Sequence, residues 1–186
     1  MRTLTHYCLA KHCLPLLPPD DTLRRAFLVG CVAPDVNLFS HIDLTAREKL
    51  PHLHGHNHPY LDKRINRMVK KLALRHTEIT PLYAFRLGVL LHYLADAFTF
   101  AHNLEFSGDF EAHNAYENAF HRYFEKRLCH LPKSFWEKPH PFCYRKLRKL
   151  YLDKKPSFAR DFCFILLAAR GVMTAFLPLP NNKILR

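Results

Sequence analysis

Residues 87–117 read LGVLLHYLADAFTFAHNLEFSGDFEAHNAYE, and this stretch decides the fold. Its first half is apolar almost all round, which predicts a helix buried inside an all-helical protein. His92 and Asp96 stand one helical turn apart, so both side chains lie on the same face. A carboxylate in such apolar surroundings is costly unless a cation or strong hydrogen-bond donors meet it. The stretch therefore predicts both the central helix and a polar site on it.

More groups of the same kind follow along the stretch. His102 comes next, and His113 and Glu117 repeat the i, i+4 spacing. Imidazole nitrogens and carboxylate oxygens in this arrangement are ligands that zinc favours. A single pair of this kind is more often a hydrogen bond or a surface ion pair than a metal site. The apolar surroundings of His92 and Asp96 favour the metal.

Two further pairs have the same spacing but different surroundings. They are His58–Asp62 and His121–Glu125. The second pair stands among Arg122, Lys126 and Arg127, so we expect it to be solvated.

Length and composition predict one domain that spans residues 1–186. The chain is 48% hydrophobic and 13% aromatic, which is enough for a sizeable core at this length. It has only 5 glycines and no long run of alternating apolar and polar residues. An all-α, single-domain helical bundle is therefore expected.

Positive charge is concentrated in the last third of the chain. Residues 121–186 hold 15 of the 28 Lys and Arg but only 4 of the 16 Asp and Glu. This predicts a basic helical C-terminal part from about residue 130. It suits an anionic partner such as lipid headgroups, nucleic acid or a phosphorylated substrate. A solvated face without a partner is the alternative.

The cysteines and the N-terminal residues predict the cellular compartment of the protein. The six cysteines are scattered and form no CxxC pair, so we expect free thiols in a reducing compartment. His6, Lys11 and His12 interrupt any apolar run at the N-terminus, which argues against a signal peptide. No apolar run is long enough to cross a membrane. The expected location is cytoplasmic.

Capping residues and prolines set the expected helix bounds. Thr5 is expected to cap the first helix, and Pro34 is expected to stop the second before Asp35. Thr80 and Pro81 start the central helix. The expected helices are 4–14, 22–32, 59–75, 81–101, 111–128 and 157–176, with a loop over 36–56 that holds a short helix near 45–50.

The histidines are unevenly distributed. Of the 14 in the chain, His52, His54, His56 and His58 form a cluster, with His41 upstream. Such a cluster indicates metal binding, although a solvated tract has the same composition.

The ordered motifs resemble a known family. LGVLLHYLADAFTFAHN followed by HNAYEN resembles the signature of the zinc-dependent phospholipase C family, which is similar to the single-strand-specific zinc nucleases. Upstream, Thr5-His6 resembles the family's N-terminal histidine, and Gly30 to Asp35 resembles its aspartate-bearing turn. The resemblance covers about residues 4–120 in consistent order. It implies a helical bundle of the phospholipase C and zinc nuclease type.

The resemblance implies a cluster of two or three zinc ions. Asp96 is implied to bridge two of them. The first ion is implied to take Asp35, His92 and one histidine of the cluster, for which His54 is preferred to His56. The second is implied to take His6 with the amine and carbonyl of the N-terminus. The third is implied to take His102, His113 and Glu117. The spacing agrees with a separate third ion, because on a straight helix His102 lies too far round to share the face of His92 and Asp96.

The chain departs from the family pattern in three places. Met1 lies only five residues before His6, with no cleavage site of the kind that exposes the terminal ligand in secreted members. The loop between His102 and His113 is short. Phe100 and Ala101 precede His102, where the family often has a proline.

The function that the resemblance implies is a zinc-dependent phosphoric ester hydrolase, phospholipase C-like. Zinc-bound hydroxide would attack phosphorus, and Asp35 would orient the water or act as general base. One alternative is a nuclease or nucleotide phosphatase on the same cluster. Another is a helical metal-binding protein without catalytic activity. The expected partner is an anionic phosphoester, with phospholipid and nucleic acid as the two macromolecular sources.

Overall fold

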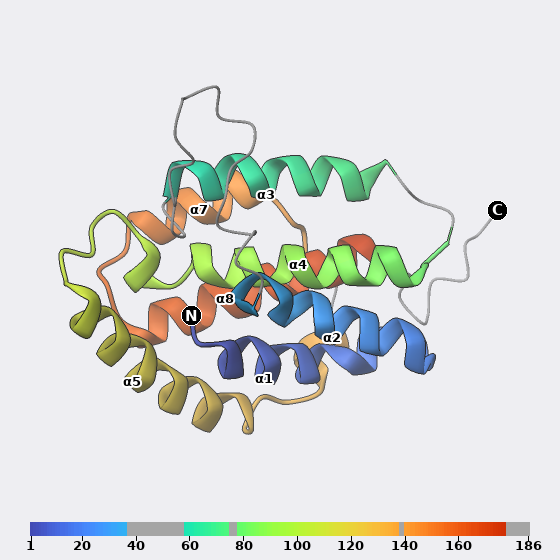
Figure 1. Cartoon of the computed structure of the whole chain (residues 1–186), viewed down its shortest axis with the longest axis horizontal. Helices are drawn as coiled ribbons and strands as arrows, with labels where there is room; N and C mark the ends of the chain where they lie inside the picture. The colour runs from blue at the N-terminus through green and yellow to red at the C-terminus, as the bar shows by residue number, and fades with distance from the viewer. Residues whose placement is uncertain (37–57, 75–77, 138–139, 178–186) are drawn as a thin grey trace.

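The central helix α4 (Pro81–Ala97) runs through the middle of the molecule (Figure 1). It begins as predicted: the Thr80 side chain accepts a hydrogen bond from the backbone N–H of Tyr83 at 3.2 Å, and Pro81 occupies the first turn. Every residue from Leu90 to Ala97 is buried, His92 and Asp96 included. The prediction of a buried central helix with polar groups on it is confirmed.

The computed structural model describes residues 1–36, 58–74, 78–137 and 140–177. Within these ranges it contains helices and turns and no strand, so the prediction of an all-α protein is confirmed. The helices share one hydrophobic cluster.

Helix α2 (Asp21–Val36) crosses α4 in close contact. A glycine stands on each helix at the crossing. A Cβ atom on Gly30 would lie 2.1 Å from the carbonyl oxygen of Phe85, and one on Gly88 would lie 2.3 Å from that of Phe27. Because both distances are far below van der Waals contact, the crossing requires glycine at both positions.

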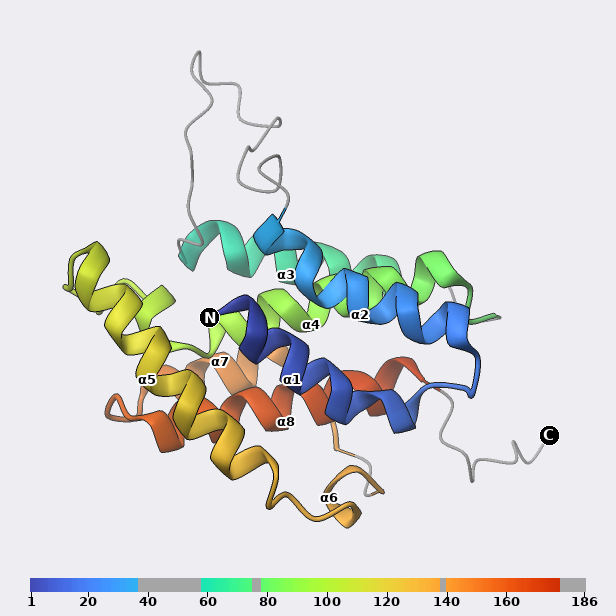
Figure 2. The same ribbon diagram turned by 60° about the horizontal axis from the view of Figure 1, so that its bottom comes forward.

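The other helices surround this pair (Figures 1 and 2). Helix α3 (His58–Ala73) packs on α4, and α8 (Phe158–Phe176) packs on α4 from another side. Helix α1 (Thr3–Cys13), followed by the 3₁₀ turn η1 (Leu14–Leu16), packs on α2. Helix α5 (Phe110–Leu128) lies along α1 and α8. The short α6 (Ser134–Glu137) and α7 (Tyr144–Leu152) join α5 to α8.

Three sequence predictions about helix ends are wrong. Thr5 does not cap α1, because the helix starts at Thr3 and Thr5 is buried within it, 2.9 Å from His121 Nδ1. His121 is half-buried and Glu125 is exposed, so the expected solvation of this pair holds for its carboxylate and not for its histidine. Helix α2 does not stop before Pro34 but continues through Asp35 to Val36. Pro34 is itself buried, so tertiary packing of the last turn outweighs the local preference against proline.

The third difference concerns the end of α4. The helix ends at Ala97, not near Ala101, and a 3₁₀ turn, η3 (Phe100–His102), follows it. Thr99 between them is extended, with φ −109° and ψ 122°. His102 therefore does not stand on the central helix.

The basic C-terminal part is helical, as α7 and α8 show, although the bounds of α7 were not predicted. Its charges are not all at the surface. Arg148 is 4% exposed and Arg160 is 7% exposed, and both bond to other protein groups. In the part of the chain that the structure describes, no helix is long and apolar enough to cross a membrane.

Candidate metal centre

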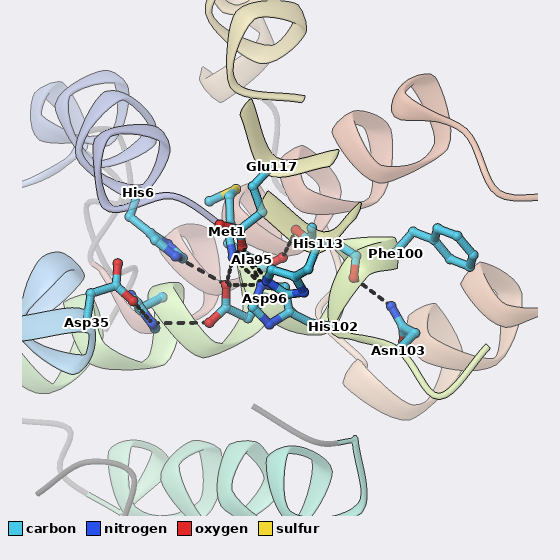
Figure 3. A network of polar contacts seen from close by, with 12 residues as sticks. Met1, His6, Asp35, Ala95, Asp96, Phe100, His102, Asn103, His113 and Glu117 are labelled. Atoms are coloured by element: carbon cyan, nitrogen blue, oxygen red, sulfur yellow. Dashed lines mark hydrogen bonds and ion pairs between the residues drawn. The ribbon is translucent and has the colours of Figure 1, made fainter. Parts of the chain in front are cut away.

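The polar side chains singled out in the sequence meet near one end of α4 (Figure 3). Five segments each contribute a residue, namely the start of α1, the last turn of α2, the last turn of α4, the turn η3 and the start of α5. They form two groups of three, each with two histidines and one carboxylate. These are His6, Asp35 and His92 for the first group, and His102, His113 and Glu117 for the second. Within each group the ligand atoms all lie within 4.8 Å of one another.

In the first group, α2 orients the ring of His92. The ring Nδ1 lies 2.9 Å from the carbonyl oxygen of Cys31. A carbonyl only accepts, so Nδ1 donates and the lone pair of Nε2 points into the site. Asp35 stands one turn after Cys31 on the same face of α2, and its Oδ1 is 3.5 Å from His92 Nε2. The continuation of α2 past Pro34 is what places Asp35 there.

His6 completes the first group from α1. Its ring stacks on that of His92, with centroids 3.8 Å apart and planes at 17°. Burial is the largest influence on His6, and together with the neighbouring His92 it lowers the pKa of His6 to about 4. His6 is therefore neutral at physiological pH, which leaves a ring lone pair available as a ligand.

The second group joins η3 to the first two turns of α5. His113 and Glu117 face each other along α5, with Nε2 and Oε1 3.2 Å apart. His102 Nε2 approaches the same oxygen at 2.9 Å. Asp109 caps α5 by accepting a hydrogen bond from Ala112 N at 2.8 Å, which places His113 in the first turn.

Asp96 lies between the two groups. Its Oδ2 is 3.2 Å from His92 Nε2, and its Oδ1 is 3.2 Å from His6 Nε2 and 3.8 Å from His102 Nε2. The carboxylate thus contacts histidines of both groups. This is the position expected of a bridging ligand.

The amine of Met1 points into the same space. It lies 2.8 Å from Asp96 Oδ1 and 2.7 Å from Glu117 Oε1, and it contacts His102 Nε2. Burial lowers the pKa of this amine, but the two carboxylates outweigh burial and raise it. The pKa of Asp96 is correspondingly held well below its usual value, because the ammonium and the histidines outweigh the effect of burial. The Met1 ammonium therefore balances part of the negative charge of these two carboxylates.

The second group contains the three ligands implied for one ion, His102, His113 and Glu117. In the first group His6 lies close to Asp35 and His92, which were implied to hold a different ion. His102 does not stand on a straight helix with His92 and Asp96, because α4 ends before it and the turn brings it back to Asp96. His54 and His56, the two histidines implied to join the first group, lie outside the described residues.

The donor set fits zinc. Nδ1 of His6 and Oδ2 of Asp35 are buried and make no hydrogen bond to any described residue. Buried polar atoms of this kind carry the cost of desolvation without a partner. Two histidines and one carboxylate are also the protein ligands of many catalytic zinc sites. An ion at the first group would satisfy these atoms.

The site opens on a pocket of about 360 Å³. Residues 1–4 line one side, and ligands of both groups line the rest, namely Asp35, His102, His113 and Glu117. The buried members, His6, His92 and Asp96, lie behind them. A small molecule that enters the pocket therefore meets both groups at once.

Comparison with known proteins agrees with this geometry. The family model described as zinc-dependent phospholipase C matches residues 5–170. The match extends well past the stretch that carries the sequence motifs, and it includes the basic helices. Searches of curated proteins and of solved structures gave no match. On the extent of the family match, the chain belongs to the zinc-dependent phospholipase C family of hydrolases.

Proposed function

We propose that the protein hydrolyses phosphoric diesters of the phospholipid type at this centre. The observation that carries the proposal is the pair of two-histidine, one-carboxylate groups joined by Asp96 and facing one pocket. The eight proposed ligands are His6, Asp35, either His54 or His56, His92, Asp96, His102, His113 and Glu117. Zinc bound to them would supply a Lewis acid for the phosphate oxygens and a water that ionises near neutral pH.

Asp35 is the proposed catalytic carboxylate. It is 17% exposed, lines the pocket, and has an oxygen without a hydrogen-bond partner among the described residues. A carboxylate at the mouth of the site can orient an attacking water and accept its proton. Asp96 is 1% exposed and makes ion pairs on both sides, so it serves the structure of the centre and not proton transfer.

Arg2 is the proposed contact for the substrate phosphate. It lines the pocket, is exposed, and its Nη1 donates to the side-chain oxygen of Asn118 at 2.5 Å. That bond holds the guanidinium beside the opening, where it can pair with a phosphate oxygen.

Replacing Arg2 by Gln is expected to raise KM for a soluble phosphodiester by roughly 10-fold, the weight of one charge-assisted hydrogen bond. Zinc content should stay unchanged, because only the side chain is replaced and its hydrogen bond goes to Asn118, which is not a ligand. Steady-state kinetics and metal analysis of the same samples check this. An unchanged KM, or a loss of zinc, would remove Arg2 from the substrate site.

The alternative of a nuclease or nucleotide phosphatase is favoured by exposed positive charge on α5 and α7. The exposed basic residues there are Arg122, Lys126, Arg127, Arg145, Lys146 and Lys149. A polyanion would bind such helices more tightly than a single lipid headgroup. The two activities would use the same metal centre. They differ in whether a polyanion or a single lipid headgroup binds at the surface around it.

The test compares substrates on protein loaded with zinc. Phosphatidylcholine in mixed micelles, single-stranded DNA and a nucleoside monophosphate are assayed in parallel, with His92→Ala as the inactive control. We expect phosphatidylcholine to be hydrolysed and the variant to be inactive. Hydrolysis of only DNA or nucleotide would select the alternative activity. Less than one tightly bound zinc per chain, or equal rates in the variant, would exclude a zinc hydrolase.

A further inference from the structure

The segment that carries His102 is held by side chains from the C-terminal helices. Arg148 on α7 donates to the carbonyl oxygen of Ala97 at 2.5 Å, and it also bonds to the side-chain oxygen of Asn103. Asp161 on α8 accepts from the backbone N–H of Phe100 through Oδ2 at 2.6 Å. Ala97 O is the acceptor that a continued helix would have offered to residue 101. The two side chains thus take the place of helical hydrogen bonds.

The same oxygen of Asp161 also reaches α5. The hydroxyl of Tyr116 donates to Asp161 Oδ2 at 2.7 Å. Tyr116 directly precedes Glu117 in the chain. One carboxylate oxygen therefore fastens together the turn that bears His102 and the helix that bears His113 and Glu117.

The Asp161 carboxylate is buried, and donors surround both of its oxygens. It is 0% exposed, and its other oxygen accepts from Tyr151 at 2.9 Å and from Arg160 at 3.2 Å. All four partners are donors, so both oxygens must accept. Burial, the largest influence, raises the pKa of Asp161, while the N–H of Phe100 and the tyrosine hydroxyls oppose that shift.

We propose that Asp161 is a positioning residue for the second ligand group, and that it sets the zinc affinity of His102, His113 and Glu117 without touching any of them. The inference rests on the metal centre of the proposed function. Its physical basis is that three ligands from two chain segments bind an ion tightly only when the segments are held at a constant separation. Outer partners of metal ligands typically contribute 10- to 100-fold in affinity.

The first variant is Asp161→Asn, which keeps the shape but turns one acceptor oxygen into a donor. Zinc binding to metal-free protein is measured by competition with a chromophoric chelator. His6→Ala and His113→Ala serve as references that assign the binding phases to the first and second groups. We expect Asp161→Asn to lower the zinc affinity of the binding phase that His113→Ala abolishes by 10- to 100-fold. The zinc affinity of the other binding phase should stay unchanged.

Tyr116→Phe supplies a milder version for the event that Asp161→Asn does not fold. It removes only the hydroxyl that links Asp161 to α5, and we expect a loss of about 10-fold in the same phase. Tyr83→Phe is the matched control, because it removes a hydroxyl that donates to Phe176 O at 2.9 Å near the start of α4. That control should lower thermal stability similarly and change neither zinc phase.

The outcomes separate the inference from the proposed function. If His113→Ala itself leaves zinc binding unchanged, the metal centre is wrong and the inference fails with it. If His113→Ala loses a phase while Asp161→Asn and Tyr116→Phe bind as the parent does, the centre stands and the positioning role is overturned. A loss in Tyr83→Phe equal to that in Tyr116→Phe would show a general effect of stability and would also overturn it.

Discussion

Replacing Asp96 by Asn is expected to abolish zinc binding at the pair of ligand groups and to lower phosphoester hydrolysis by about 1,000-fold. Asp96 is 1% exposed and contacts His6, His92, His102 and the Met1 ammonium, so its charge is shared by the whole centre. Removing one partner from a buried charge network costs roughly 3–5 kcal/mol, which corresponds to about 100- to 1,000-fold or more in affinity. The measurements are metal analysis after dialysis and initial rates at saturating substrate.

Asp62→Asn is the control for this substitution. Asp62 is a half-buried carboxylate on α3 that bonds to the hydroxyl of Tyr144, and it is not among the proposed ligands. We expect Asp62→Asn to retain zinc and activity. If Asp96→Asn also keeps two zinc ions per chain, Asp96 does not bridge the groups, and the assignment of the centre around it is wrong.

Replacing Gly88 by Ala is expected to lower the free energy of unfolding by about 2 kcal/mol. The new Cβ would lie 2.3 Å from the carbonyl oxygen of Phe27 and 2.9 Å from the backbone nitrogen of Cys31, so the two helices must separate. Overpacking of this kind costs roughly 1–3 kcal/mol, although alanine is the better helix former by about 1 kcal/mol. Chemical denaturation of metal-free protein measures the difference.

The same substitution should weaken the first ligand group. Asp35 stands on α2 and His92 on α4, so separation of these helices moves two ligands apart, whereas the second group does not depend on the crossing. Gly171→Ala on α8 is the matched control, because its Cβ would lie 3.1 Å from Cδ2 and 3.4 Å from Cα of Phe142, which are far looser contacts than those at Gly88. Equal destabilisation by both substitutions would show that the α2–α4 contact is not the cause.

Local patterns were sufficient for much of the fold. The start of α4 at Thr80-Pro81 and the start of α8 at Ser157 follow from capping chemistry that acts within one turn. The burial of α4 follows from its apolar composition. The zinc family was recognised on motifs that lie within residues 4–120, and the family match confirms it. The cytoplasmic location and the assignment of ligands to individual ions stay predictions.

Helix ends under tertiary control could not be predicted in this way. Pro34 favours a helix stop locally, but the last turn of α2 is packed against the molecule and continues. At the other end of the site, Ala97 and Phe100 look like parts of one long helix. Their backbone groups bond instead to Arg148 and Asp161, which follow 51 and 61 residues later. No local signal identifies such partners.

The sequence by itself determined the two pairs His92–Asp96 and His113–Glu117, because the helical period places residues four apart on one face. Only the tertiary structure decided what surrounds them. The crossing at Gly30 and Gly88 brings Asp35 to His92, and the capture of backbone groups by Asp161 and Arg148 turns His102 back towards Asp96 and Glu117. These contacts join distant parts of the chain. They depend on the packing of whole helices, which the spacing of residues along one helix does not contain.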